Sequence, residues 1–356
     1  MKSNKPVIGI TCGDLNGVGL ELIFESFKEK KLLELFTPVI YAPLKAVNYY
    51  RNNLGYNDFS FNQANSINDI QDRKINVINT TSGEIEINIG ESTPTGGQIA
   101  REALITAGKD LKEGSLNALV TCPINKNNIQ SDDFKYPGHT EFLNELDGSD
   151  GVMILMTNKL RVAVYTGHIP VSQVAESLTA EKLKAKIEQI SNILQLDFNI
   201  TKPKIAVLGL NPHAGDEGLI GKEDQEIILP VCQEFQSKGD LVYGPHPADG
   251  FFGSGAYQKY DAILAMYHDQ GLIPFKTLSF GQGVNYTGGL NFIRTSPDHG
   301  TAFDIAGKKE VSTSSFLEAI YAAIDIYKRR SLNIDLKENA LQVSNKNHKG
   351  RRSQIS

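Results

Sequence analysis

The chain has 356 residues, enough for two domains of ordinary size; 40% of the residues are hydrophobic and 22% are charged. This composition is typical of a globular protein. A formal net charge of -5 argues against nucleic acid or an anionic membrane surface as the main partner, but it leaves room for a local basic pocket that binds a small anion.

No apolar run approaches the roughly 20 residues that a membrane-spanning helix needs, and the first residues lack the hydrophobic region of a signal peptide. Cys12, Cys122 and Cys232 are far apart and form no CxxC pair. This spacing is typical of reduced thiols, and it argues against a disulfide framework or a thiolate zinc site. We therefore expect a cytoplasmic protein that acts on a small molecule, with no nucleic-acid or membrane partner.

Short apolar runs predict strands, and they alternate with segments that predict helices. In chain order, we predict strands at 7–11, 39–42, 118–121, 152–156, 162–165, 205–210 and 262–267, and helices at 17–30, 97–112, 179–195, 222–237 and 313–329. The strand runs are continuously apolar, as expected for a sheet covered on both faces. This alternation predicts an α/β fold with a largely parallel sheet. In the last helix, Ser315 and Glu318 are the predicted capping box.

Three of the predicted strands are followed closely by a histidine. His168 follows the strand in RVAVYTGHIP, His213 the strand in KIAVLGLNPHAG, and His268 the strand in AILAMYHDQG. In an open α/β sheet, ligands bind beyond the carboxyl ends of the strands, and parallel strands would place all three imidazoles at one edge. Three neutral imidazoles with an open coordination position form the ligand set of a catalytic divalent metal, most often zinc.

Each of these histidines, taken alone, has a simpler interpretation as a surface or hydrogen-bonded loop residue. All three occupy the same position relative to a strand, and that repetition favours a metal role. Separations of 45 and 55 residues are too long for a local ligand motif. The prediction therefore depends on the fold bringing the three side chains together.

Basic and polar residues lie in other predicted loops. Lys276 follows the third histidine, and Asn285 and Arg294 lie in the next segments of the chain. A lysine, an arginine and an amide in one region suit the capture of a phosphate or carboxylate, although either cation alone is also ordinary surface charge. Upstream, the stretch YPGHTE places His139 and Thr140 directly after a turn.

Two glycine-rich stretches fail as nucleotide-binding motifs. GDLNGVG at residues 13–19 follows a predicted strand and begins a helix, but its spacing is not GxGxxG. GDEGLIGK at residues 215–222 is one residue too long for a P-loop, and Glu223 stands where Ser or Thr is required. A nucleotide cofactor would need another binding geometry.

These residues belong to a longer series of motifs that resembles the 4-hydroxythreonine-4-phosphate dehydrogenase family of pyridoxal phosphate biosynthesis. The series runs from Gly9 to Lys308, and its HDQGLIP and RTSPDHGTAFDIAGK blocks are highly specific. In chain order the motifs are GITCGDLNGVGLE, TCPINK, PGHTEFL, GHIP, GLNPHAGDEGLIGKED, PADGFF, YDAILAMYHDQGLIPFK and GVNYTGGLNFIRTSPDHGTAFDIAGK.

The resemblance implies a fold similar to that of isocitrate and isopropylmalate dehydrogenases, which consists of two α/β/α domains with a mostly parallel sheet and an active site in the interdomain cleft. Residues 1–125 and 285–335 would form a terminal domain on the nucleotide side. Residues 126–284 would form a central domain with the metal and the dimer interface, and residues 336–356 a flexible tail.

The resemblance also implies roles for individual residues. His168, His213 and His268 correspond to the ligands of a metal at the interface of a homodimer, where the partner subunit supplies one ligand. The substrate-contacting positions correspond to His139, Thr140, Lys276, Asn285 and Arg294. The loop of His299, Gly300, Thr301 and Ala302 resembles the adenosine side of a dinucleotide site.

The implied reaction is the NAD- or NADP-dependent oxidation of 4-phosphooxy-L-threonine at C3, followed by loss of carbon dioxide to give 3-amino-2-oxopropyl phosphate. A divalent metal, with Zn, Mg and Co as candidates, would stabilise the alkoxide and polarise the new ketone. Lys276, His139 and Asp269 are the candidates for the general base. The nearest alternative is a dehydrogenase of the same family that acts on 4-phosphoerythronate or phospho-D-threonate, and a more distant one is a three-histidine metal hydrolase.

Overall fold

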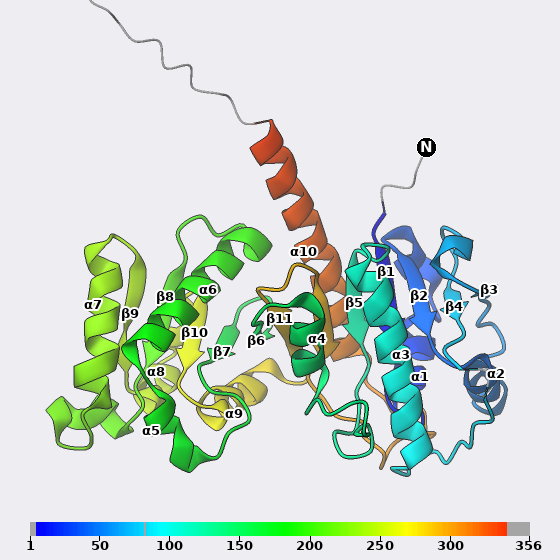
Figure 1. Cartoon of the computed structure of the whole chain (residues 1–356), viewed down its shortest axis with the longest axis horizontal. Helices are drawn as coiled ribbons and strands as arrows, with labels where there is room; N and C mark the ends of the chain where they lie inside the picture. The colour runs from blue at the N-terminus through cyan, green and yellow to red at the C-terminus, as the bar shows by residue number, and fades with distance from the viewer. Residues whose placement is uncertain (1–4, 82, 340–356) are drawn as a thin grey trace, which may run out of the picture.

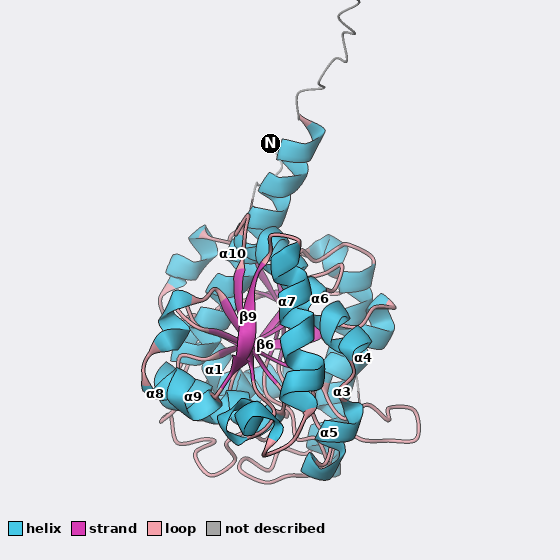
Figure 2. Ribbon diagram, turned by 90° about the vertical axis from the view of Figure 1, so that its left-hand side faces the viewer, coloured by secondary structure: helices cyan, strands magenta, loops and turns pink. Residues whose placement is uncertain are grey.

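The computed structural model describes residues 5–81 and 83–339, in which twelve strands form one mixed sheet with helices on both faces (Figure 1, Figure 2). The strands are β1 (Val7–Thr11), β2 (Thr37–Tyr41), β3 (Asn62–Ala64), β4 (Asn76–Ile78), β5 (Ala118–Thr121), β6 (Val152–Met156), β7 (Arg161–Val164), β8 (Lys204–Leu208), β9 (Leu241–His246), β10 (Ala262–Ala265), β11 (Val284–Gly288) and β12 (Arg294–Pro297). The α-helices are α1 (Gly19–Ser26), α2 (Leu44–Asn53), α3 (Pro94–Lys112), α4 (His139–Asp147), α5 (Val174–Ser177), α6 (Ala180–Phe198), α7 (Leu229–Ser237), α8 (Ala248–Gly253), α9 (His268–Ser279) and α10 (Ser314–Glu338).

The strand order is β3-β4-β2-β1-β5-β12-β11-β6-β7-β10-β8-β9. Neighbouring strands are parallel except at three places in the middle, where β11 is antiparallel to β12 and β6, and β6 is antiparallel to β7. The predicted α/β fold with a mostly parallel sheet is therefore confirmed. The antiparallel strands join two parallel halves, seen at the two ends of the molecule in Figure 1.

All seven predicted strands and all five predicted helices are present, β1, β5 and β6 with the predicted bounds and the others with shifted bounds, but several elements were not predicted. The missed strands are β3, β4, β9, β11 and β12, of which the first two have only three residues each. The two strands β11 and β12 read VNYTG and RTSP, and their polar residues hide the apolar run that buried strands usually have. They are polar because one of their faces lines a cavity.

Two expectations for the last helix were wrong. Thr313 precedes α10 as its N-cap, and the hydroxyl of Ser315 donates to the carbonyl of Gly283 without forming a capping box. Helix α10 also continues to Glu338, so residues 336–338 are helical and do not belong to a tail. Asn339 is the C-cap of this helix, and residues 340–356 of the predicted tail lie outside the described residues.

The middle strands line a cavity with one face and pack against helices with the other. Leu155, Asn285 and Ser296 are paired across β6, β11 and β12, and they line a cavity on one face. On the opposite face, the hydroxyl of Tyr286 donates to Asp197 at the end of α6, which also accepts from Arg330 of α10. Because side chains alternate along a strand, α6 and α10 support the floor of the cavity from behind.

We expect Asp197→Asn to lower the free energy of unfolding by about 3–5 kcal/mol, because it leaves the charge of Arg330 partly buried without a counterion. Asp197 is 1% exposed, and its carboxylate lies 2.5 Å from the Nε of Arg330. Urea denaturation measures the change. The control is Glu29→Gln, which breaks the exposed pair with Lys31 and should leave the urea midpoint unchanged.

Candidate active site

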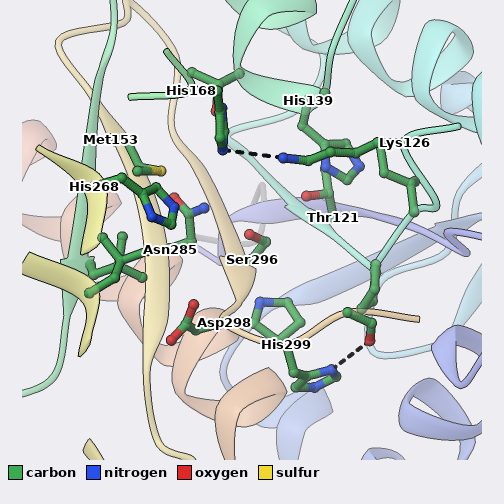
Figure 3. Close-up of a pocket in the computed structure, with 18 of the residues that line it drawn as sticks. Thr121, Lys126, His139, Met153, His168, His268, Asn285, Ser296, Asp298 and His299 are labelled. Carbon is green, nitrogen blue, oxygen red and sulfur yellow. Dashed lines mark hydrogen bonds between the residues drawn. The ribbon is translucent and has the colours of Figure 1, made fainter. Parts of the chain in front are cut away.

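A cavity of about 390 Å³ opens between the two parallel halves of the sheet, over the face of β6, β11 and β12. Loops that follow β5 and β12 and the first turn of α4 form one wall, and the loop after β7 and the first turns of α9 form the other. Figure 3 shows the polar side chains that point into this space. Ten of the residues predicted for the site line it, namely His139, Thr140, His168, His268, Asp269, Lys276, Asn285, Arg294, His299 and Gly300.

Two of the three predicted metal ligands lie together at one wall. His168 is in the loop after β7, His268 is the first residue of α9, and their ring centroids are 5.5 Å apart. The strands that precede them, β7 and β10, are adjacent and parallel, so both loops leave the sheet at the same edge. In Figure 3 the two rings face Lys126 and His139 across the cavity.

A carboxylate lies near the Nδ1 atom of each ring. Asp269 Oδ1 lies 2.7 Å from the Nδ1 of His268, and Glu141 Oε1 lies 3.8 Å from the Nδ1 of His168. The interaction with His168 lowers the pKa of Glu141. A carboxylate at Nδ1 leaves Nε2 as the coordinating atom, which is the usual arrangement around metal-bound histidines. The chemistry of these donors therefore fits a divalent metal.

The third predicted ligand, His213, is exposed and does not line the cavity. It lies in η4 (Pro212–Gly218), after β8, which is parallel to β10 and next to it. The prediction that the three histidines follow strands ending at one edge is thus confirmed. Within residues 5–81 and 83–339 of one chain, however, no three His, Cys, Asp or Glu side chains are grouped closely enough to hold a metal.

The loop that carries His213 has an unusual and well-anchored backbone. His213, Ala214, Asp216 and Glu217 all have positive φ angles, from 44° to 56°, in the left-handed region that non-glycine residues rarely adopt. The carboxylate of Asp224 is fully buried and accepts from the backbone N–H groups of Leu210 and Asn211, at 2.8 and 3.1 Å. Asp224 thereby positions the start of the loop. Such backbone conformations persist where the surrounding structure enforces them, and they are common at functional sites.

A buried arginine forms the cationic part of the cavity. Arg294 is 2% exposed, and its Nε and one terminal nitrogen donate to the hydroxyl of Thr121 at 3.1 and 2.8 Å. Its other terminal nitrogen donates to the hydroxyl of Thr287 at 3.2 Å. Burial lowers the pKa of Arg294 to about 10, which still leaves the guanidinium charged at neutral pH. Among the described residues it forms no ion pair within 4 Å, so its charge is available to an anionic ligand.

Three buried polar atoms of residues that line the cavity have no partner among the described residues. They are the Nε2 of His139, the first residue of α4, the Oδ1 of Asn285 on β11, and the Nε2 of His299 after β12. A buried polar atom without a hydrogen bond costs about 1–3 kcal/mol, so these atoms are expected to bind a ligand or water. His139 and Asn285 were predicted to contact the substrate, and His299 the cofactor.

We expect His139 to make the folded protein less stable in acid. Burial lowers the pKa of His139 well below its usual value, and the charges of Arg294 and Lys126 lower it further. The unfolded chain binds a proton near pH 6.5 and the folded chain does not, so stability should fall by up to about 1.4 kcal/mol per pH unit below that value. Urea unfolding of the wild type and His139→Gln at several pH values measures this slope. An identical slope in both proteins would contradict the prediction.

The second predicted cation, Lys276 of α9, is more exposed than Arg294. Its Nζ lies 3.5 Å from a carboxylate oxygen of Asp298, which follows β12 and also lines the cavity. Burial raises the pKa of Asp298, and the neighbouring Lys276 partly offsets that effect. On the opposite wall, the Nζ of Lys126 lies 3.2 Å from the Nε2 of His168.

The predicted adenosine-side loop is divided between two environments. His299 and Gly300 line the cavity, whereas the carbonyl of Thr301 accepts from the N–H of Val18 at 3.0 Å. A Cβ atom at Gly17 would lie 2.8 Å from that carbonyl oxygen, so glycine permits the two loops to approach. Gly17 in the glycine-rich stretch after β1 therefore has a packing role.

Several lining residues were not predicted as site residues, among them Thr121, Lys126, Glu141, Ser296 and Asp298. Thr121 and Lys126 follow an apolar strand run in the same way as the histidines, and that signal was present in the sequence. Ser296 and Asp298 carried no such signal, because the strand that precedes or contains them is polar.

Comparison with known proteins identifies the family. The model of the family described as pyridoxal phosphate biosynthetic protein PdxA matches residues 34–323. The chain belongs to this family. It is 48% identical over 332 residues to a 4-hydroxythreonine-4-phosphate dehydrogenase of Bacteroides thetaiotaomicron, covering 93% of this chain and 91% of the relative. The family membership makes this PdxA protein an oxidoreductase.

Other relatives agree with this assignment. A protein of Oceanobacillus iheyensis, provisionally named a D-threonate 4-phosphate dehydrogenase, is 39% identical and covers 91% of this chain and 98% of its own length. The crystal structure of a 4-hydroxythreonine-4-phosphate dehydrogenase from Klebsiella pneumoniae superposes with a TM-score of 0.76 at 34% identity, covering 92% of this chain and 99% of that one. No helix in the described part of the chain is long and apolar enough to cross a membrane.

Proposed function

We propose that this PdxA protein oxidises 4-phosphooxy-L-threonine at C3 with NAD or NADP and then releases carbon dioxide, giving 3-amino-2-oxopropyl phosphate for pyridoxal phosphate biosynthesis. One observation carries the proposal. A single cavity holds the imidazoles of His168 and His268 at one wall and the buried guanidinium of Arg294 at its floor. A phosphorylated hydroxy acid has the matching parts, which are a hydroxyl group and two anionic ends.

The binding roles follow from the charges and the unpartnered atoms. Arg294 and Lys276 attract the phosphate and carboxylate groups, since both are cations that line the cavity. Arg294 is held by hydrogen bonds to Thr121 and Thr287, so little conformational entropy is lost when it binds an anion. The free Oδ1 of Asn285 accepts a hydrogen bond and suits the substrate ammonium group.

His139 and Thr140 begin α4 and face the same cavity. His139 stays neutral at neutral pH, because burial lowers its pKa, and one of its ring nitrogens can then accept a proton. Lys276 and Asp269 are the other candidates for the general base. Parallel kinetics of His139→Gln, Lys276→Met and Asp269→Asn would separate them, because only loss of the base removes the acidic limb of the pH profile of kcat.

Two groups outside the protein complete the chemistry. A divalent metal, Zn, Mg or Co, would lower the pKa of the substrate hydroxyl and polarise the ketone, and NAD or NADP would accept the hydride. His168 and His268 would hold the metal, because their Nδ1 atoms face carboxylates. The loop of His299 to Ala302 is the candidate for the adenosine side of the cofactor, on the evidence of the family motif alone.

The active site is proposed to be shared within a homodimer. A protein metal site that keeps one position open for substrate has three protein ligands, and one chain brings only two of the three predicted ligands, His168 and His268, to the cavity. His213 is exposed on a loop of defined conformation, followed by Leu219, which is 83% exposed, and by Ile220. An exposed ligand next to exposed apolar side chains is suited to reach the cavity of a partner subunit.

The experiment that tests the function offers the purified protein 4-phosphooxy-L-threonine, 4-phosphoerythronate and phospho-D-threonate, each with NAD and with NADP. We expect the highest kcat/KM with 4-phosphooxy-L-threonine and one carbon dioxide for each reduced nicotinamide. The relative from Oceanobacillus iheyensis makes phospho-D-threonate the competing substrate. Reduction of the cofactor with that substrate alone would contradict the proposal, and turnover without a nicotinamide would indicate a hydrolase instead.

A further inference from the structure

A second cavity, of about 120 Å³, lies on the face of the sheet opposite the catalytic cavity, against α10. Met156 of β6 and Val284 of β11 line it. Their chain neighbours Leu155 and Asn285 point to the other face and line the catalytic cavity. The two cavities are therefore separated by the thickness of one sheet.

Two arginines from distant parts of the chain meet in this rear cavity. The guanidinium carbon of Arg161, at the start of β7, lies 4.4 Å from the ring centroid of Phe198. The guanidinium carbon of Arg329, on α10, lies 5.8 Å from the centroid of the same ring. Both arginines line the cavity. Two like charges next to one ring repel each other, and an anion between or beside them would offset that repulsion.

The hydrogen bonds of the two arginines leave most of their donors free. Arg161 donates to the carbonyl of Asp261 at 3.2 Å, and its buried Nε has no partner. Arg329 donates to the carbonyl of Asp197 at 3.4 Å. Among the described residues, neither guanidinium forms an ion pair within 4 Å, although both arginines are only partly exposed.

The direction of the pKa shift of Arg161 agrees with a site for an anionic ligand. Burial lowers the pKa of Arg161, the nearby carboxylate of Asp261 raises it, and the charge of Arg329 lowers it further. The carboxylate only partly offsets the other two effects, so the pKa of Arg161 stays below its usual value.

We propose that the rear cavity binds the phosphate group of a small ligand between Arg161 and Arg329. A phosphate monoester carries nearly two negative charges at neutral pH, which matches two guanidinium groups. Arginine presents several donors in a planar fork that suits phosphate oxygens. The polar side chains of Thr157 and Asn158 also line the cavity and can bind further oxygens.

Acidic residues at the same cavity limit the affinity. Glu318 and Asp325 of α10 line it together with Arg329, and both are at least partly exposed. Their charges oppose an anion but lie more than 4 Å from either guanidinium. Glu318→Gln and Asp325→Asn should therefore each tighten phosphate binding about two- to fivefold, an effect that a nonspecific surface site would not show.

Crystals of the full-length protein soaked in arsenate, a heavy analogue of phosphate, test the site directly. We expect anomalous density between the two guanidinium groups in the rear cavity, in addition to any in the catalytic cavity. Density in the catalytic cavity alone would overturn the proposal. Density that persists in Arg329→Met would show an adventitious ion only, and it would also overturn it.

Equilibrium dialysis with labelled inorganic phosphate and with glycerol phosphate tests the site in solution. Arg329→Met should lose one class of bound phosphate, with binding weakened about tenfold or more, while kcat/KM of the oxidation stays unchanged. Arg51→Met is the matched control, because Arg51 also lies over a phenylalanine, at 5.8 Å from the centroid of Phe61, but outside the cavity. Phosphate binding equal in both variants and the wild type would contradict the proposal. Tighter binding of glycerol phosphate than of phosphate would identify an organic phosphate ester as the ligand.

Discussion

His213→Ala is expected to abolish dehydrogenase activity and tight metal binding while leaving the fold of each chain intact. His213 is exposed and does not line the cavity of its own chain, so a structural role in that chain predicts almost no effect. If the histidine is instead the third metal ligand of a partner's site, its loss should lower metal affinity about 10²-fold or more. Metal content after gel filtration and the thermal unfolding curve measure the two expectations separately.

Subunit mixing distinguishes a shared site from other roles of His213. Two inactive variants, His213→Ala and His168→Ala, are unfolded together in equal amounts and refolded. A mixed dimer then has one site with His168 and His268 from one chain and His213 from the other, and a second site that lacks two ligands. Activity should return to about a quarter of the wild-type value, because half of the dimers are mixed and each has one intact site. If the mixture stays inactive, the site is not shared in this way.

Arg294→Met should lower kcat/KM by about 10²- to 10³-fold, because a buried guanidinium gives about 1.5–3 kcal/mol for each hydrogen bond to a charged group. The side chain is 2% exposed and held by Thr121 and Thr287, so no neighbouring cation can replace it at the same place. Steady-state kinetics with the phosphorylated substrate measure the loss. The main effect should be on KM, since the charge binds the anionic ends in the ground state as well as the transition state.

Arg294→Lys is the matched control, because it keeps the charge and removes the fork of donors. Lysine cannot bond both threonines and the substrate in the same geometry, so an intermediate loss of kcat/KM is expected. Thermal unfolding shows whether either variant is misfolded. A KM of Arg294→Met equal to that of the wild type, in a folded protein, would remove Arg294 from the proposed binding site.

The sequence was most informative where local burial leaves a pattern. Continuous apolar runs predicted β1, β5 and β6 with their observed bounds, because strands covered on both faces must be apolar throughout. The position of a histidine just past a strand predicted that His168 and His268 would lie at one edge, since parallel strands share an edge at their carboxyl ends.

The sequence was least informative for β11 and β12. Asn285, Thr287, Arg294 and Ser296 are polar, and three of them are buried, so these strands lack the apolar runs from which the other strands were predicted. These strands are polar on one side because they form the floor of the cavity, and on the other side they pack against α6 and α10 through Tyr286 and Thr295. The reason for this polar face is evident only once the order of the strands in the sheet is known.

How many of the three predicted metal ligands one chain brings together could not be predicted from apolar runs and spacing. All three histidines follow strands in the same manner, but His168 and His268 meet at the cavity while His213 remains apart. The distinction depends on the conformation of the loop that carries His213. Buried Asp224 anchors that loop by accepting hydrogen bonds from Leu210 and Asn211, which are fourteen and thirteen residues away along the chain. The sequence by itself determined most of the strands and helices, because the burial of each side chain leaves a local pattern of residue types. Which distant side chains share one cavity was decided by the strand order and by long-range packing, because those contacts join segments whose separation along the chain carries no local signal.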